Sequence, residues 1–445
     1  MTGHATLICD VPARVPYRGS CGIVARSLTH SLRRHDHAVR ELWVPLSDKH
    51  SAISLPRRRS ASAEGVHLFF EELFARCVRD AEFQRWPSVV FFNLPHFRFP
   101  EQCEADGLIF NSKYLMDCFR HEAFARNLAL PPMTCAPLEL PLHAFPDGYP
   151  SPGNRLARKL IGDLADQVHL GHALRPGKAD RFATLSIMHH LNQMAIACAT
   201  KPFLLMISAR DRPDFEQTLR DMPIPAETLE SLLPVPHLTN RSLVSVMRHS
   251  KFGLCHDTFV EAFGFYPVES VYSGCPVFTN GAANLRHLLP ARSGIEVQDD
   301  FAMHFGPLDE RVEAYRAVAE RVFRVVMAGE GPALCERGAR YIDRHYCQAA
   351  FSERVGRLLS QARRFHRSKP GRRGHDQPGR AAQVSPYLRL ADWKHGRFVT
   401  DLGNVEVAAD VAAEWQRVLS SSAPPRDTSG PAIPLCIGAV RPDAA

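Results

Sequence analysis

Two carboxylates frame an apolar stretch in the second half of the chain, in the segment EAFGFYPVESVYSGCPVFTNG that runs from Glu261 to Gly281. Glu261 and Glu269 are separated by seven residues, which include a glycine, a proline and three aromatic side chains. Such a pair would repel a bare phosphate at either edge, but it can accept hydrogen bonds from hydroxyl groups. The pair therefore fits a ligand with phosphates in its middle and hydroxyl-rich groups at both ends, as in a nucleotide-sugar.

Local signals predict a short helix inside this segment. Pro267 suits the first helical position, because a proline has no N–H group to leave unpaired there. Gly274 stands where a glycine commonly ends a helix, and Pro276 prevents its continuation. We therefore expect a helix over about Pro267 to Ser273, with Glu269 in the first turn, where a carboxylate favours the positive helix end.

The loop before this helix has the features of an anion site. The amides of residues 262–266 would lie at a helix N-terminus, and Gly264 would allow a ligand to approach the main chain. Glu261 falls in this loop and not on the helix. On the spacing alone, Glu269 as an ordinary helix-cap acid and Glu261 as a surface residue stay open.

The whole segment resembles the donor-site motif of retaining GT-B glycosyltransferases of the large family four. That pattern is a glutamate, seven residues with Phe-Gly-aromatic, a second glutamate and then Gly-x-Pro-Val. The matching residues here are Glu261, Phe263-Gly264-Phe265, Glu269 and Gly274-Cys275-Pro276-Val277. The resemblance implies that Glu261 faces the transferred sugar, that Glu269 binds the ribose hydroxyls, and that Phe263, Gly264 and Phe265 belong to the donor site.

The resemblance extends over about residues 1–364. The stretch YRGSCGIVARSLTHSLRRHDHAV looks like the N-terminal glycine loop and helix of the family. Gly19 and Gly22 would let this loop approach the donor phosphates or the acceptor. His96, after VVFFNLP, stands where the family has an active-site histidine at a strand end, and a structural role for it stays equally open.

One stretch, LGHALRPGKAD, departs from the family pattern. The family usually has Gly-Arg here and a lysine five or six residues later, and these cations neutralise the diphosphate leaving group. Lys178 matches the lysine, but His172 stands at the arginine position. Arg175 could replace the arginine, or His172 could serve if protonated, which would make donor binding pH-sensitive. Arg175 and Lys178 as solvated loop charges also stay open.

The resemblance implies transfer without a metal, with no cofactor and with retention of the anomeric configuration. No Asp-x-Asp tripeptide occurs in the sequence, which agrees with this expectation. Glu261, His96 and Lys178 are the expected catalytic residues. The expected donor is a UDP-, GDP-, ADP- or dTDP-linked sugar, and the sequence does not identify the acceptor.

Strands and helices that could position these residues alternate in two series. Ser88–Leu94 and Gly107–Ser112 are near-continuous apolar runs, as expected of parallel strands covered on both faces. Further expected strands are Ala5–Val11, His37–Val44, Pro202–Ala209 and Cys275–Asn280, and helices are expected from Asn240, over 310–327 and over about 333–364. The pattern predicts an α/β protein of GT-B architecture, with two facing Rossmann-like domains, an interdomain cleft and a small C-terminal appendage.

Composition supplies the expected boundaries. The proline-rich stretch 138–153 would connect the two domains. We expect an acceptor domain at 1–145, a donor domain at 150–345, a helix returning to the first domain at 346–366, a basic linker at 367–383, a module of a β-hairpin and a helix at 384–420, and a disordered tail at 421–445.

Charge and cysteine content narrow the class of protein. Of the formal net charge of +7 over 445 residues, most comes from 361–380, which holds seven Lys or Arg and one acid. No aromatic residues suited to base stacking are interleaved with these charges, so a solvated linker is favoured over a nucleic-acid site. The 12 cysteines form no C-x-x-C pair, and no signal peptide or apolar span of membrane length is evident, which favours a cytoplasmic location. Peripheral membrane contact stays open.

Three alternatives remain. The protein could bind nucleotide-sugars without turnover, as a regulator or pseudoenzyme, because His172 stands where the family usually has an arginine. The basic linker and the C-terminal module could make the chain an interaction protein. A sugar-phosphate phosphorylase is the least favoured, because no lysine anchored for pyridoxal phosphate stands out.

Overall fold

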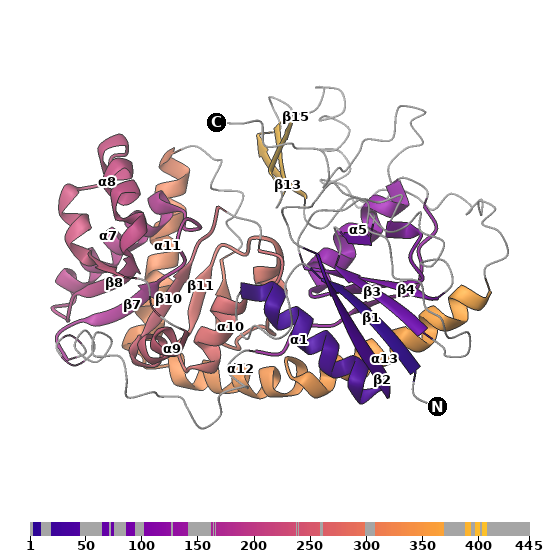
Figure 1. The fold of residues 1–445 in the computed structure, drawn as a ribbon. Coiled ribbons are helices and arrows are strands. Elements are labelled where there is room, and N and C mark those ends of the chain that lie inside the picture. Colours follow the sequence, from indigo (N-terminus) through magenta and orange to yellow (C-terminus); the bar gives the residue numbers. More distant parts are fainter. Residues whose placement is uncertain are drawn as a thin grey trace. The chain divides into compact units, whose positions relative to one another are not determined.

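The computed structural model describes residues 3–9, 19–44, 65–70, 73–74, 86–93, 102–125, 128–140, 162, 164, 166–236, 238, 240–258, 261–298, 308–368, 388–392, 397–400 and 403–406. The contacts among these residues divide the chain into two units (Figure 1). The first unit holds strands β1 to β6 with the helix α13, and the second holds strands β7 to β12 with most of the helices.

A parallel sheet of six strands forms the centre of the first unit, in the order β2-β1-β3-β4-β5-β6. Every residue of β3, β4 and β5 is buried, which explains why these strands are almost entirely apolar. The strands are β1 (Gly3–Cys9), β2 (His37–Trp43), β3 (Gly65–Phe70), β4 (Ser88–Phe92), β5 (Gly107–Phe110) and β6 (Met133–Cys135).

Helices cover both faces of this sheet. Neighbouring residues of a strand point to opposite faces, so apolar side chains on both faces need to be buried. On β4, the ring of Phe91 lies 6.4 Å from that of Phe351 on α13 (Gln348–Arg367), whereas the ring of Phe92 lies 5.3 Å from that of Phe119 on α5 (Lys113–Ala125). The helix α1 (Gly19–Arg34) packs against α13. The N-terminus of α5 is capped by Ser112, whose Oγ accepts from the Leu115 amide at 3.3 Å.

The second unit contains another parallel sheet of six strands, in the order β12-β11-β10-β7-β8-β9. Its strands are β7 (His169–Ala173), β8 (Phe203–Ser208), β9 (Leu232–Val235), β10 (Phe252–Cys255), β11 (Val277–Thr279) and β12 (Ile295–Val297). Its helices are α7 (Arg181–Ala197), α8 (Arg212–Asp221), α9 (Asn240–His249), α10 (Phe265–Tyr272), α11 (Leu308–Met327) and α12 (Gly331–His345).

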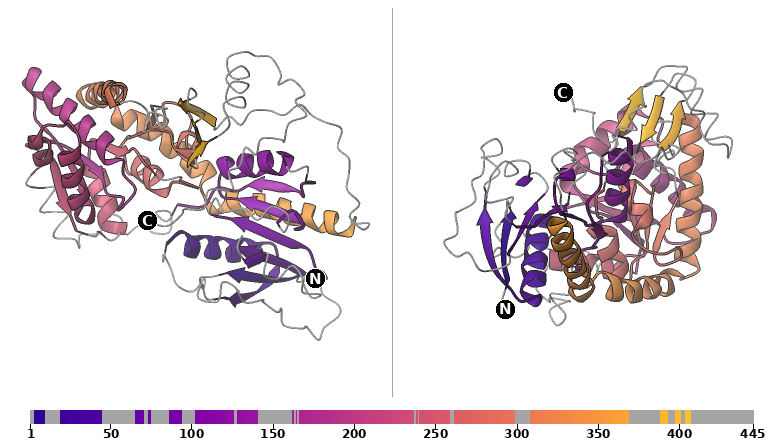
Figure 2. Two further views of the ribbon diagram at one scale, coloured as in Figure 1. Left: turned by 90° about the horizontal axis from the view of Figure 1, so that it is seen from above. Right: turned by 90° about the vertical axis from the view of Figure 1, so that its right-hand side faces the viewer.

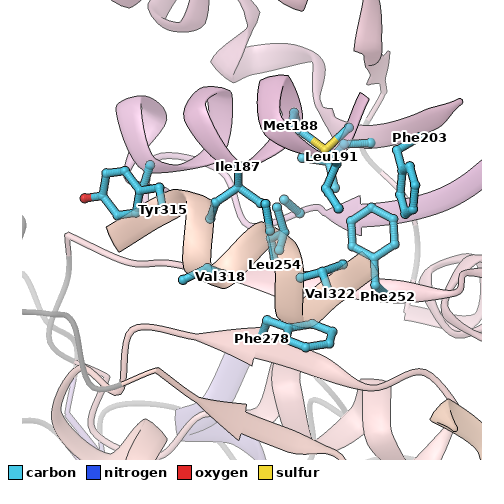
Figure 3. Packing of buried hydrophobic residues seen from close by; sticks show 14 of the residues in the cluster. Ile187, Met188, Leu191, Phe203, Phe252, Leu254, Phe278, Tyr315, Val318 and Val322 are labelled. Carbon is cyan, nitrogen blue, oxygen red and sulfur yellow. The ribbon is translucent and has the colours of Figure 1, made fainter. Parts of the chain in front are cut away.

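The core of this unit lies mainly between the sheet and the helices α7 and α11. Figure 3 shows Ile187 and Leu191 of α7 and Val322 of α11 meeting over Leu254 of β10. Strand β8 serves both faces. Leu205 and its alternate neighbours join this cluster, whereas Met206 packs on the other side with Val246 of α9. This alternation fixes which side chains of β8 face the helices on each side of the sheet.

The sheet reverses its strand order between β7 and β10. From β7 the chain proceeds to β8 on one side, whereas β10 lies on the other side, with Gly253 in register with His172. Open α/β sheets bind ligands beyond the carboxyl ends of the strands at such a reversal point. The segments that follow β7 and β10 are therefore the first place to look for a site.

The α/β class with two Rossmann-like units is confirmed, while a cleft between facing domains stays a prediction. Three details differ from the expectation. The helix α10 begins at Phe265, two residues before Pro267, so that Glu269 lies in its second turn. Gly22 lies within α1, which begins at Gly19, and not in a loop. The helix expected over about 333–364 is two helices, α12 and α13.

The C-terminal module contains one strand more than the expected hairpin. The strands β13 (Leu388–Asp392), β14 (Arg397–Thr400) and β15 (Gly403–Glu406) pair in antiparallel order, and they lie side by side in Figure 2. The helix expected after them lies outside the described residues. Among the helices that the structure describes, none is long and apolar enough to cross a membrane.

The helix α10 ends at a glycine in the left-handed conformation, and this ending can be tested by substitution. Gly274 adopts φ 94° and donates to Val271 O at 2.9 Å, and the Cys275 amide donates to Ser270 O at 3.0 Å, which is a Schellman motif. No atom would contact an added Cβ at Gly274, so a substitution there tests the backbone conformation only. We expect Gly274→Ala to lower the free energy of unfolding by about 1–2 kcal/mol.

Gly274→Asn is the matched variant for chemical denaturation. Asparagine tolerates the left-handed conformation better than alanine does, so the larger side chain should cost less stability. A greater loss with asparagine than with alanine would show that steric crowding and not backbone conformation decides this position.

Candidate functional site

The segments after β7 and β10 are joined to each other directly. Ala179 and Asp257 form an isolated antiparallel bridge, the Asp180 amide donates to His256 O at 2.7 Å, and the Thr258 amide donates to Lys178 O at 3.1 Å. Residues 174–180 and 256–258, with Glu261, therefore lie together beyond the carboxyl ends of two neighbouring strands. Three of the residues that the sequence singled out, Arg175, Lys178 and Glu261, lie here.

Arg175 is at the centre of this place. Its guanidinium forms ion pairs with the carboxylates of Asp257 and Glu261, and it donates to the Cys255 sulfur at 3.0 Å. Only 10% of the Arg175 side chain is exposed. Burial would lower its pKa, but Asp257, Cys255 and Glu261 outweigh that effect and raise the pKa well above its usual value. The site therefore contains a permanent cation.

Glu261 connects this arginine with the predicted lysine. Lys178 Nζ lies 3.1 Å from Glu261 Oε2, the same oxygen that pairs with Arg175. The structure thus brings together three residues predicted from the sequence, namely Arg175, Lys178 and Glu261. It also adds Asp257, whose carboxylate is buried and which the sequence analysis missed. Its position two residues after the end of β10, at the reversal of strand order, was the available signal.

The loop before α10 is fixed by its neighbours. Asn284 donates from its side chain to Phe263 O at 2.7 Å and from its amide to Glu261 O at 3.2 Å. Gly264 caps the helix with φ 102°, and a Cβ there would lie 2.8 Å from Leu288. The helix has no side-chain cap at this end, so its first amides point into the loop without an internal acceptor. The rings of Phe263 and Phe265 contact each other edge to face, with 4.6 Å between the ring centres.

Glu269 differs from the cluster around Arg175. It is half-buried, and burial raises the pKa of its carboxyl to about 8. Among the described residues, no hydrogen bond or ion pair engages this carboxylate, and it is not part of the Arg175 cluster. A desolvated carboxyl without a protein partner is a typical feature of a ligand site, because a structural acid would normally be paired.

Of the two alternatives for the missing arginine, the one in which His172 serves as a protonated cation does not fit the structure. The ring is fully buried, with Nδ1 next to the Tyr266 hydroxyl and Nε2 2.9 Å from Ser270 Oγ. Burial lowers its pKa to about 3, so the ring is neutral at physiological pH. Arg175, three residues later, is the residue that brings a guanidinium to this site. The role of His172 as a donor-binding residue is not tested by these contacts.

The remaining predicted residues lie elsewhere or are not described. Gly19 and Gly22 both belong to the first turn of α1, in the first unit. His96 lies outside the described residues. In the part of the chain that the structure describes, no group of three or more His, Cys, Asp or Glu side chains is placed to hold a metal ion.

Comparisons with known proteins bear on the fold. No family model matches the chain, and no curated protein matches it in sequence. Among solved structures, the chain is similar to an α,α-trehalose-phosphate synthase (UDP-forming) from Burkholderia vietnamiensis, with 12% identity, a TM-score of 0.58, and coverage of 84% of this chain and 100% of that chain. A structure from Escherichia coli described as trehalose-6-phosphate bound with UDP-2-fluoro glucose matches at 10% identity and a TM-score of 0.57, over 80% and 99%. A sucrose-phosphate synthase from Thermosynechococcus elongatus matches at 12% identity and a TM-score of 0.51, over 81% and 98%.

The chain has the GT-B fold. The likeness covers nearly the whole length of each of these glycosyltransferases. At such low identity it concerns the fold only. The predicted GT-B architecture is confirmed by it, and the roles of individual residues stay predictions.

The raised pKa of Glu269 predicts a pH-dependent contribution to the stability of this GT-B chain. Between about pH 5 and pH 8 the unfolded chain releases this proton, since the usual pKa is 4.5, whereas the folded chain retains it. Folding stability therefore falls as the pH rises through this window and stays level above it. Glu269→Gln removes this loss, so its melting temperature should exceed that of the wild type by an amount that grows from pH 5 to pH 8.

Thermal denaturation of both proteins across this pH range measures the effect. Two parallel curves would show that the Glu269 carboxyl ionises in the folded protein as readily as in the unfolded chain. That result would show that the Glu269 carboxyl is not desolvated in the folded protein.

Proposed function

We propose that the chain is a glycosyltransferase that moves a sugar from a nucleotide-sugar donor to an acceptor, with retention of the anomeric configuration and without a metal. In this proposal Lys178, Arg175 and the amides at the start of α10 hold the diphosphate. Glu261 orients the transferred sugar, and Glu269 accepts hydrogen bonds from the ribose hydroxyls.

The observation that carries the proposal is the convergence of Arg175, Lys178 and Glu261 beyond the carboxyl ends of β7 and β10. Two cations beside an uncapped helix N-terminus can neutralise the charge that develops on a departing diphosphate. A carboxylate within the same cluster can accept hydrogen bonds from sugar hydroxyls. The E. coli structure named with UDP-2-fluoro glucose makes a UDP-sugar the first donor to test.

The ion pairs suggest how the donor would enter. Without a donor, Glu261 forms ion pairs with both Lys178 and Arg175, so a diphosphate must compete with it for these cations. When the diphosphate takes over the cations, the Glu261 carboxylate becomes available to the sugar hydroxyls. Donor binding would thus couple leaving-group neutralisation to sugar orientation, because one carboxylate exchanges its partners.

The chemistry of the transfer follows from this arrangement. The acceptor hydroxyl would attack on the face from which the diphosphate departs, and the departing phosphate would help to take its proton. Glu261 would orient the sugar and would not form a covalent intermediate. His96 remains a proposed catalytic residue.

Substitutions in the cluster should separate binding from turnover. Lys178→Met should weaken UDP binding by about 1.5–3 kcal/mol, because a charge-assisted hydrogen bond to the diphosphate is lost. Glu261→Gln should leave UDP binding equal or tighter, because a competitor for the cations is removed, while transfer from the UDP-sugar falls about 100-fold or more. Calorimetry with UDP and a donor-consumption assay measure the two effects.

Matched controls exist in the same unit. Glu296 is paired with Arg321 at 3.0 Å and is exposed to nearly the same degree as Glu261, 13% against 15% of the side chain. Glu296→Gln should change neither quantity, and neither should Lys201→Met at an exposed lysine. If UDP, GDP, ADP and dTDP all fail to bind the wild type, the proposal is wrong. Binding without transfer to any acceptor or water would instead indicate a pseudoenzyme.

Truncation distinguishes a transferase from an interaction protein that works through its C-terminal module. Truncation after Ser368 retains α13 and its contact between His366 and Asp106, at 3.1 Å. We expect this shortened chain to bind and consume donor at rates within about threefold of those of the full chain. Loss of both activities in a shortened chain that melts at the same temperature would assign an essential role to residues after 368.

A further inference from the structure

His172 is part of a buried hydrogen-bonded chain that joins two elements of the proposed donor site. The Leu174 amide donates to the Tyr266 hydroxyl at 2.8 Å, and this hydroxyl also contacts His172 Nδ1. On the other side of the ring, Nε2 lies 2.9 Å from Ser270 Oγ, which contacts Cys275 O at 3.0 Å. All three side chains in this chain are buried.

The direction of each hydrogen bond can be worked out from the number of protons. Ser270 has one hydroxyl proton, and the carbonyl of Cys275 can only accept, so this proton goes to the carbonyl. Ser270 Oγ must then accept from His172 Nε2, which therefore carries the ring proton. Nδ1 is left as an acceptor for the proton of Tyr266. The histidine is thus a neutral ring in one tautomer, with both nitrogens satisfied.

This chain engages both turns of the helix α10. Tyr266 is the second residue of the helix, next to the amides proposed to hold the diphosphate, and Ser270 lies one turn later, next to Glu269. On the side of β7, the bond to the Leu174 amide fixes the residue that directly precedes Arg175. The Arg175 guanidinium also lies over the Tyr266 ring, 5.8 Å from its centre.

We infer that His172 is a positioning residue, which holds the Arg175 segment and helix α10 in one fixed arrangement by donating to Ser270 and accepting from Tyr266. The inference rests on the proposed function, since the arrangement matters for a donor held by both elements. A neutral ring suits this task better than an arginine at the same position would. A guanidinium has no acceptor for the Tyr266 proton and would add a second buried cation close to Arg175.

The room for the ring comes from a glycine on the neighbouring strand. A Cβ on Gly253 would lie 2.7 Å from His172 Cε1, so a side chain there would displace the ring. Gly253→Ala therefore disturbs the histidine without removing any polar group. It offers a second way to test the inference if a substitution at His172 prevents folding.

The first experiment needs no donor. Hydrogen exchange of the Leu174 amide reports whether Tyr266 still holds the Arg175 segment. We expect Tyr266→Phe, His172→Leu and Gly253→Ala to increase the exchange rate of this amide about tenfold or more. His172→Gln should stay within about threefold of the wild type, because its neutral amide offers one acceptor and one donor. Nitrogen NMR of labelled histidine should show the ring proton on Nε2.

The second experiment measures UDP affinity by calorimetry. We expect His172→Leu to weaken UDP binding about tenfold, which corresponds to about 1.4 kcal/mol, and His172→Gln to restore it to within threefold. His169→Leu is the control, because His169 lies on the same strand and bonds to Thr200 at 3.3 Å, away from α10. This control should leave UDP affinity unchanged.

The outcomes separate the inference from the proposed function. Unchanged Leu174 exchange and unchanged UDP affinity in His172→Leu and Gly253→Ala would overturn the positioning role while the glycosyltransferase proposal stands. Equal losses of UDP affinity in His172→Leu and His172→Gln would also overturn it. The shape of the His172 side chain and not its hydrogen bonds would then determine the affinity. A wild type that binds none of the four nucleoside diphosphates would overturn the proposed function, and the role of His172 at a donor site would fall with it.

Discussion

The buried guanidinium of Arg175 is the constraint on which the rest of the site depends. An arginine cannot give up its charge on burial, so it needs carboxylates within contact distance. Asp257 supplies one from the segment after β10, and Glu261 supplies the other from the loop that leads into α10. Because both anions come from β10 and the cation from β7, balancing this charge also fixes how the ends of two neighbouring strands meet.

A neutral layer lies beside this charged one, and the two have different tasks. In the charged layer Glu261 can exchange one cation partner for another, because ion pairs tolerate small shifts of partner. In the neutral layer each donor has one acceptor, and the directions from Tyr266 to His172 and from His172 to Ser270 follow from proton count. Hydrogen bonds that allow only one arrangement fix the geometry of the residues they join. Glu261 could therefore change its ion-pair partner while the Tyr266–His172–Ser270 hydrogen bonds keep the backbone around it in place.

The sequence predicted those features that are local. The spacing of Glu261 and Glu269 and the glycine that ends α10 depend on residues within one short segment, and so do the strands that the sequence predicted in the two sheets. Asp257 could not be found in this way, because its partner Arg175 is 82 residues away and meets it only through the pairing of β7 with β10. The sequence left open a protonated His172 for a related reason. Spacing shows that a histidine replaces an arginine, but burial by Tyr266 and Ser270, which decides its charge, is a property of the folded sheet and helix.

The family that the sequence resembles usually has an arginine where this chain has His172, and this difference would affect how the chain binds a diphosphate. An arginine at the end of β7 would compete with Arg175 for Asp257 and Glu261, and a second guanidinium in a buried place would need a second pair of carboxylates. Moving the cation three residues along the chain allows the position on the strand itself to become neutral and fully buried. The site then retains one guanidinium and one lysine, matched by two carboxylates, so that only an incoming anion changes the balance. The strength of donor binding would then be set by the difference between diphosphate and Glu261 as partners for the same two cations.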